Sequence, residues 1–186
     1  MHIKDIINKG QPSFSFEFFP PKSDKSSDEL LKTIKDLEPL DPSYVSITYG
    51  AGGTTRERTH ELVEKILDLT NLVPIPHLTC VQHDEEELLR ILNRYCDKGV
   101  SNVLALRGDP PKGNNNYDRS HDTFQYACDL VKFIRGFAKK TKSLGIGVAG
   151  FPEGHPETPN RLKEMDYLKA KIDSGADYIC TQLFFD

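Results

Sequence analysis

Residues 13–21 read Ser-Phe-Ser-Phe-Glu-Phe-Phe-Pro-Pro, and this stretch decides the fold. Aromatic and polar side chains alternate along it: Phe14, Phe16 and Phe18 share one parity, and Ser13, Ser15 and Glu17 share the other. Alternation with a period of two is typical of a β-strand with two unlike faces. The two prolines then end the strand. We therefore predict a strand over Ser13–Phe19 that carries one apolar and one polar face.

The rest of the chain alternates strand and helix patterns in the same way. Short runs rich in Val, Ile, Phe and Tyr predict further strands at Tyr44–Thr48, Val73–Cys80, Asn102–Arg107, Leu144–Phe151 and Asp177–Phe185. Apolar residues at helical spacing predict helices at Asp28–Leu37, Arg56–Leu69, Glu85–Lys98, Phe124–Lys140 and Arg161–Ser174. This order favours an α/β fold in which helical crossovers join parallel strands.

Helix ends carry capping signals. Ser26-x-x-Glu29, Thr54-x-x-Glu57 and Asp84-x-x-Glu87 each place a capping oxygen three residues before a Glu. Gly99 and Gly175 follow the third and fifth helices, where a left-handed residue is expected.

An open doubly wound sheet and a (β/α)8 barrel both fit this order of elements. Polar residues occupy one parity of several strands: Ser46 and Thr48 oppose Val45 and Ile47, His77 and Thr79 oppose Leu78, and Leu104 and Leu106 oppose Ala105 and Arg107. An open sheet that is covered on both faces is apolar on both parities. Polar residues that share one face of each strand and become more frequent toward the strand ends favour a (β/α)8 TIM barrel. We predict one catalytic barrel domain over residues 1–186, with about the first six βα units and a C-terminally incomplete barrel.

Composition excludes several classes of protein. The net charge of −4 argues against nucleic-acid binding, which needs a basic face. The four cysteines form no C-x-x-C pair, so reduced thiols in a cytoplasmic protein are expected and a metal site is not. The N-terminus has no apolar segment typical of a signal peptide, and no apolar run reaches the roughly 20 residues of a membrane span.

Several strand ends carry residues that could perform chemistry. Glu17, which lies among three Phe, is a candidate general acid because apolar surroundings favour the protonated carboxyl; the alternative is a Glu that reaches solvent. Arg107-Gly108-Asp109 could bind an anion through the guanidinium, or Arg107 and Asp109 could form an ion pair within a turn.

Further candidates follow other strands. The Gly-rich segment from Tyr49 to Thr55 is a weak nucleotide signal, because it matches neither a P-loop nor G-x-G-x-x-G. Without an H-x-x-x-H pair, His77 and His155 are not expected to bind a metal. Gln182 could hydrogen-bond a planar heterocycle or the backbone. In a barrel these residues, together with Thr48, would converge on one mouth. The residues alone predict an enzyme with a planar, partly anionic ligand.

Six strings in order resemble the methylenetetrahydrofolate reductase family: F-E-F-F-P-P, T-Y-G-A-G-G-T-T, P-H-L-T-C, L-A-L-R-G-D-P-P, P-E-G-H-P-E and T-Q-L-F-F-D. The resemblance covers essentially the whole chain. It implies a barrel that binds FAD and reduces 5,10-methylenetetrahydrofolate to 5-methyltetrahydrofolate with NADH or NADPH. It also implies ping-pong hydride transfer, a role in one-carbon metabolism and methionine supply, and a homo-oligomer when the chain is full length.

The resemblance also assigns residues. Glu17 matches the general acid that protonates folate N10, and Asp109 and Gln182 match contacts to the substrate. The positions that match FAD contacts are Thr48, His77, Arg107, Gly108, Asp109, Tyr126, Ala127, Phe151, His155, Glu164 and Lys171.

The chain departs from the family pattern at Phe151, where bacterial relatives often have Tyr, and at Glu164 and Tyr167 on the adenosine side. Two other hypotheses stay open. The chain could be a different TIM-barrel enzyme, such as a lyase or aldolase, or a catalytically incomplete fragment that acts as a flavin-binding, folding or interaction module.

Overall fold

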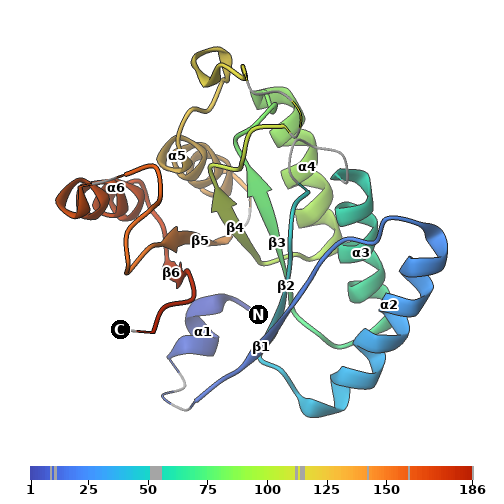
Figure 1. Ribbon diagram of the computed structural model, residues 1–186. Helices are drawn as coiled ribbons and strands as arrows, with labels where there is room; N and C mark the ends of the chain where they lie inside the picture. The colour runs from blue at the N-terminus through green and yellow to red at the C-terminus, as the bar shows by residue number, and fades with distance from the viewer. Residues whose placement is uncertain are drawn as a thin grey trace.

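The computed structural model describes residues 1–8, 10, 12–50, 56–111, 113, 116–141, 143–158 and 160–185. Its strands and helices alternate along the chain (Figure 1). In order they are α1 (Ile3–Ile7), β1 (Ser15–Phe18), α2 (Asp24–Leu37), η1 (Glu38–Leu40), β2 (Tyr44–Ile47), α3 (Arg56–Leu69), β3 (Pro74–Thr79), α4 (Glu85–Lys98), β4 (Asn102–Leu106), η3 (Arg119–His121), α5 (Ala127–Ala138), β5 (Gly145–Gly150), α6 (Arg161–Asp173) and β6 (Tyr178–Thr181).

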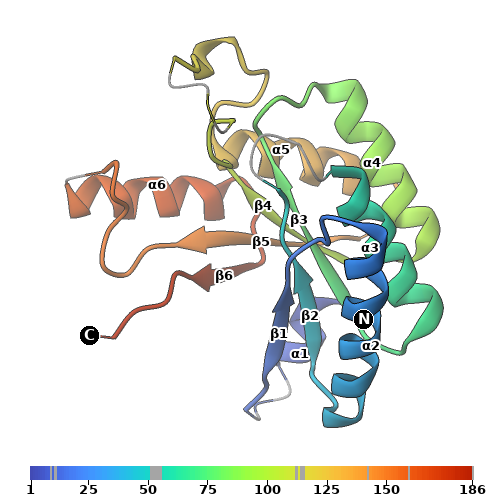
Figure 2. The same cartoon turned by 45° about the vertical axis from the view of Figure 1, so that its right-hand side comes forward.

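In the described residues the strands form one six-stranded sheet in the order β1-β2-β3-β4-β5-β6, and every neighbouring pair is parallel. The sheet curls, and helices α2 to α6 lie along its outer side (Figures 1 and 2). Sequential order without a reversal is the topology of a (β/α)8 barrel rather than of a doubly wound sheet. The predicted fold class is therefore confirmed, because six parallel strands and the helices between them form part of such a barrel.

The larger hydrophobic core lies between the sheet and its outer helices. Val45, Ile47, Leu78, Val103 and Val148 face outward from four strands and are fully buried there. Leu and Ile side chains on α3, α4 and α5 pack against them, at Leu62, Ile66, Leu88, Leu92, Leu130 and Ile134. Full burial of each such side chain stabilises the fold by roughly 2 kcal/mol.

A smaller core lies inside the curl of the sheet. Ile3 and Ile6 of α1 pack there against Ile75 of β3 and Leu104 of β4. Asn102, at the start of β4, fixes the helix: its side-chain oxygen accepts from the Ile3 backbone N–H at 2.7 Å. The amide group of Asn102 also donates to the Met1 carbonyl at 2.8 Å. Helix α1 therefore closes the amino-terminal end of the lumen, a role that the sequence patterns did not predict.

The faces of β1, β2 and β3 lie as the alternation predicts. Phe18 is buried in the outer core, whereas Glu17 faces the lumen beside residues of β2 and β3. Strand β4 departs from the polar trend, because Leu104 and Leu106 belong to the inner core. Polar residues thus line the inner face of the first three strands near their carboxyl ends, and apolar residues continue on the fourth.

The helix ends confirm some capping predictions and correct one. Asp84 caps α4 by accepting from Glu87 N–H at 2.7 Å, and Gly99 ends that helix with a φ of 90°. Gly175, with a φ of 113°, follows α6 as predicted. Helix α2 instead begins at Asp24, because Ser23 rather than Ser26 is its N-cap. The Thr54 signal lies outside the described residues.

Candidate active site

Glu17 is the central polar residue of the lumen. Parallel pairing sets Glu17 of β1 opposite Ser46 of β2. The Ser46 hydroxyl donates to Glu17 Oε2 at 3.1 Å. The Glu17 side chain is 50% exposed, so the carboxyl is accessible from the lumen. The expected apolar setting is wrong in this respect: Phe16 and Phe18 lie on the opposite parity, Phe19 is exposed just after the strand, and Glu17 lies beside polar groups and solvent.

His77 of β3 lies beside the same carboxyl. Its Nε2 is 3.5 Å from Glu17 Oε2, and its side chain is only 8% exposed. Among the described residues, this buried Nε2 has no hydrogen-bond partner. Burial lowers the pKa of His77, and the negative charge of Glu17 opposes that effect.

Strand β6 places the thiol of Cys180 near the Glu17 carboxyl. Cys180 is exposed on β6, and partial desolvation of its thiol, followed by the charge of Glu17, raises its pKa. Cys180 is therefore a neutral thiol near the carboxyl at neutral pH. Two residues later, Gln182 donates its backbone N–H to Gly150 O at 2.8 Å, and its exposed side chain lies at the end of β6.

A second group of charges lies at the ends of β4 and β5. Arg107 pairs with Glu157 at 2.7 Å, and this hydrogen-bonded guanidinium lowers the pKa of Glu157. Gly108 has a φ of 81°, and its carbonyl accepts from Arg119 Nη2 at 2.8 Å. The predicted alternative of an Arg107–Asp109 pair is replaced by the pair with Glu157, and Asp109 is exposed.

Aromatic rings and a lysine continue this group along β5. Phe151 and His155 stack edge to face with centroids 4.6 Å apart. The Lys171 ammonium lies 5.8 Å from the centre of the Phe151 ring and donates to Ala149 O at 2.8 Å. Burial lowers the pKa of Lys171, while buried Glu164 acts in the opposite direction. The side chain of Lys171 thus bridges helix α6 and the end of β5.

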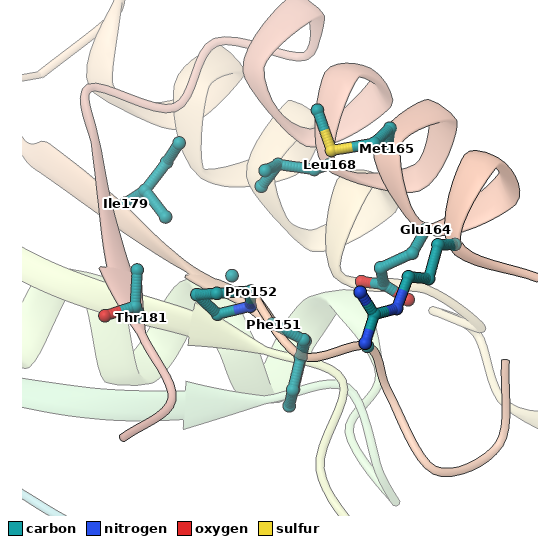
Figure 3. A pocket seen from close by; sticks show the side chains of 10 residues that line it. Phe151, Pro152, Glu164, Met165, Leu168, Ile179 and Thr181 are labelled. Atoms are coloured by element: carbon teal, nitrogen blue, oxygen red, sulfur yellow. The ribbon is translucent and has the colours of Figure 1, made fainter. Parts of the chain in front are cut away.

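A groove of about 420 Å³ lies between α6 and the outer face of β6. Ile179 and Thr181 project into it from the strand, and Met165 and Leu168 project from the helix (Figure 3). Phe151 and Pro152 line its floor, and Glu164 faces it from the first turn of α6. The groove is mainly apolar and is continuous with the group around Phe151.

The other predicted residues surround these two groups. Thr48 follows β2, and its carbonyl accepts from Thr59 Oγ1 at 3.2 Å. Tyr126 and Ala127 lie at the start of α5, and Tyr126 is 58% exposed. The structure therefore gathers Glu17 and His77 in the lumen, and Arg107, Phe151, His155, Glu164 and Lys171 at the rim. It leaves Asp109, Tyr126 and Gln182 as exposed side chains around them.

Behind the lumen, a buried network of rings ties the segment after β2 to helices α3 and α4. Tyr49 hydrogen-bonds His83 Nε2 at 3.0 Å, and His83 Nδ1 donates to Val81 O at 3.1 Å. His60 of α3 bonds the Tyr95 hydroxyl at 2.7 Å. Burial, together with nearby Arg94, lowers the pKa of His60 to about 4. The Gly-rich segment at 51–55, which Tyr49 precedes, lies outside the described residues.

Sequence reasoning missed two close partners in the site. Ser46 was placed on the polar parity of β2, but only the pairing of β1 with β2 sets it beside Glu17. Glu157 ends the string P-E-G-H-P-E, but its pairing with Arg107 depends on how the loops after β4 and β5 approach each other. No group of three or more metal-ligating side chains gathers in the described part of the chain. Within that part, no helix is long and apolar enough to cross a membrane.

Six parallel strands joined by helices, with polar residues gathered at the carboxyl ends of the strands, define a TIM-barrel protein with its site at the mouth. Solved structures share this fold. A phosphoenolpyruvate phosphomutase from Streptomyces platensis subsp. rosaceus aligns with a TM-score of 0.61 at 9% identity over 95% of this chain and 62% of that one. A 2,3-dimethylmalate lyase aligns with a TM-score of 0.58 at 10% identity over 91% and 58% of the chains.

The particular family follows from the sequence comparisons. The family model for methylenetetrahydrofolate reductase matches residues 2–186, and the chain belongs to this family. It is 39% identical to the 5,10-methylenetetrahydrofolate reductase of Escherichia coli (strain K12), over 98% of this chain and 60% of the relative. It is also 39% identical to methylenetetrahydrofolate reductase (NADH) 1 of Arabidopsis thaliana, over 99% of this chain. The chain spans about a third of the length of that plant relative (32%).

Proposed function

We propose that this chain provides the flavin site and the acid of an enzyme that reduces 5,10-methylenetetrahydrofolate to 5-methyltetrahydrofolate. The observation that carries the proposal is the accessible carboxyl of Glu17, which Ser46 and His77 hold at the mouth of a barrel. NADH is the proposed donor because the plant relative has NADH in its name. The two substrates would bind in turn, in a ping-pong sequence.

FAD is the proposed cofactor, and its bound ring would accept a hydride from NADH and pass it to the folate. The residues present fit such a group. Arg107 and Lys171 offer cations for a diphosphate, and Phe151 with the apolar groove offers surface for flat rings. Lys171 is held by a backbone carbonyl beside Phe151, so its charge is already positioned. The full proposed set is Thr48, His77, Arg107, Gly108, Asp109, Tyr126, Ala127, Phe151, His155, Glu164 and Lys171.

Glu17 would act on the folate as a general acid. The five-membered ring of the substrate opens when a proton reaches N10, and an exposed carboxyl in the lumen can deliver that proton. Asp109 and Gln182, both exposed at strand ends, would contact the substrate ring. Neutral hydrogen-bonding groups around Glu17 would orient the carboxyl and leave its approach to the substrate open.

Separate measurement of the two half-reactions tests this proposal. Purified protein should show the visible absorbance of bound flavin. The substitution Glu17→Gln should leave flavin reduction by NADH within a few-fold of wild type but slow folate reduction by roughly 10²–10⁴-fold. Glu29→Gln, at an exposed position of α2, is the matched control. A colourless protein would contradict the flavin assignment, and equal loss of both half-reactions would contradict the acid role.

We also propose that residues 1–186 belong to a single catalytic barrel domain that works in the cytoplasm as part of a homo-oligomer. These proposals rest on the family and on the continuous sheet from β1 to β6. Sedimentation of the purified protein would measure the state of assembly.

A further inference from the structure

The turn after β4 carries two successive backbone N–H groups, those of Gly108 and Asp109, that have no acceptor among the described residues. The carbonyl group of each preceding residue is held by a distant donor. Cys80 N–H donates to Arg107 O at 3.2 Å, and Arg119 Nη2 donates to Gly108 O at 2.8 Å. In a trans peptide the N–H points opposite to the C=O, so these two bonds fix the directions of both free N–H groups.

The chain that follows Gly108 cannot hold its carbonyl group. In a tight turn a carbonyl usually accepts from the N–H two or three residues later. After Gly108 these positions are Pro110 and Pro111, and proline has no N–H. Gly108 has a φ of 81°, but a glycine does not fix this conformation, because many others remain open to it. The carbonyl therefore needs a donor from elsewhere, and Arg119 supplies it.

The guanidinium of Arg119 is directed at this one peptide. Among the described residues, Gly108 O is its only acceptor, and its buried Nη1 has no partner. An arginine that joins segments for stability spreads its donors, as Arg135 does when it donates to Gly175 O at 3.0 Å and to Leu144 O at 3.1 Å. Arg119 reaches the turn from the start of η3, 11 positions later in the chain.

Loss of this bond would allow the peptide between Gly108 and Asp109 to turn over. Because Gly108 tolerates both signs of φ, a rotated peptide is sterically accessible to it. Rotation would place a carbonyl oxygen where the Asp109 N–H now lies, and an acceptor would replace a donor beside Arg107. A ligand atom that accepts a hydrogen bond would then be repelled rather than bound.

We propose that Arg119 is a positioning residue that holds the Gly108 carbonyl and so keeps the Asp109 N–H available to a bound ligand. Two adjacent N–H groups next to the Arg107 guanidinium fit a hydrogen-bond acceptor, neutral or anionic. The inference deepens the proposed function and rests on it, because Gly108 and Asp109 are among the residues proposed to contact the flavin. Arg119 itself acts through the backbone and needs no contact with the ligand.

The bond can be observed at a single peptide. The dipeptide Gly-Asp occurs once in the sequence, at Gly108-Asp109. Protein labelled with ¹³C in the glycine carbonyl and ¹⁵N in aspartate therefore gives one correlated signal for this peptide. In flavin-free protein, Arg119→Met should shift the ¹³C signal of the Gly108 carbonyl, because a charged donor is lost. In the wild type, added FAD should shift the amide ¹H signal of Asp109.

Flavin affinity measures the consequence. Arg119→Met should raise the Kd for FAD about 10-fold, the loss expected for one hydrogen bond to a charged group. Arg119→Lys should retain part of the affinity, because an ammonium can donate to the same carbonyl. In Arg119→Ala, added n-propylguanidinium should restore FAD binding, whereas sodium at equal ionic strength should not. Arg90→Met, at an exposed position of α4, is the matched control and should bind FAD like the wild type.

Rescue distinguishes positioning from a general loss of folded structure, since a misfolded loop would not respond to a small guanidinium. An unchanged ¹³C signal in Arg119→Met, an unchanged Kd, or a loss that neither lysine nor n-propylguanidinium restores would overturn the inference. A wild-type protein that binds no FAD would refute the proposed function instead. The ¹³C signal of flavin-free protein would then still decide whether Arg119 holds the Gly108 carbonyl.

Discussion

Protonation of His60 should destabilise the fold at mildly acidic pH. His60 is 4% exposed, bonds the Tyr95 hydroxyl at 2.7 Å and packs against the ring of Tyr49 with centroids 5.9 Å apart. Its burial and the neighbouring Arg94 lower its pKa to about 4 in the folded protein. In the unfolded chain the same group takes up a proton near pH 6.5.

The sign and size of the effect follow from proton linkage. Between pH 6.5 and pH 4 the unfolded chain binds more protons at this residue than the folded chain, so stability decreases as the pH falls. The contribution of His60 is fully present above about pH 6.5. Its loss amounts to about 2 kcal/mol at pH 5 and about 3 kcal/mol at pH 4. Such a loss is a large part of the roughly 5–15 kcal/mol that stabilises a typical domain.

Urea unfolding at pH 7 and pH 5, in the wild type and in His60→Asn, measures this contribution. Asparagine places an amide where Nδ1 lies, so it can keep the bond to Tyr95, but it does not titrate. Between the two pH values, the carboxyl groups of the chain change the free energy of unfolding by the same amount in both proteins. The wild type should therefore lose about 2 kcal/mol more than the variant between the two pH values. His121→Asn removes a histidine whose side chain is 85% exposed and should lose as much as the wild type.

An equal pH dependence of the wild type and His60→Asn would refute this reasoning. It would mean that the buried ring takes up its proton without a cost, through local opening of α3 or through solvent entry. The ¹⁵N signal of His60 would distinguish these cases, since a ring that stays buried should remain neutral down to about pH 4.

Two further substitutions test how α1 and the turn after β4 are held. Asn102→Ala should lower the free energy of unfolding by about 2–3 kcal/mol, because the buried Ile3 N–H loses its acceptor. It should also speed amide hydrogen exchange in α1, and unchanged exchange would contradict the role of α1 in closing the lumen. Gly108→Ala should reduce the flavin retained per chain, because a Cβ there would lie 2.8 Å from Thr79 Cβ in a backbone with φ of 81°. Gly113→Ala, at φ of 84° with open space around the Cβ, is its control, and equal flavin loss in both would argue against the close contact.

The sequence predicted the framework of the site because strands impose a period of two. Once Phe14, Phe16 and Phe18 are assigned to the outer face, Glu17 must face the lumen. The same reasoning placed His77 on an inner face. It could not predict how exposed Glu17 is, because flanking Phe residues in the sequence lie on the other side of the strand in space.

Partners from distant loops could not be predicted from the sequence. Arg107 and Asp109 are two residues apart, yet Arg107 pairs with Glu157, 50 positions away. Which carboxylate a guanidinium meets depends on loop paths, and those paths depend on the packing of whole βα units.

The sequence by itself determined the family, the alternation of strands and helices, and the parity that turns Glu17 and His77 inward. These features are local or periodic, and so they are present in the order of the residues. Only the tertiary structure decided that α1 closes the lumen, that Ser46 donates to Glu17, and that a buried Nε2 of His77 is left facing the Glu17 carboxyl. Register and burial arise from the packing of the strands against one another, and they set which atoms meet and which charges remain solvated.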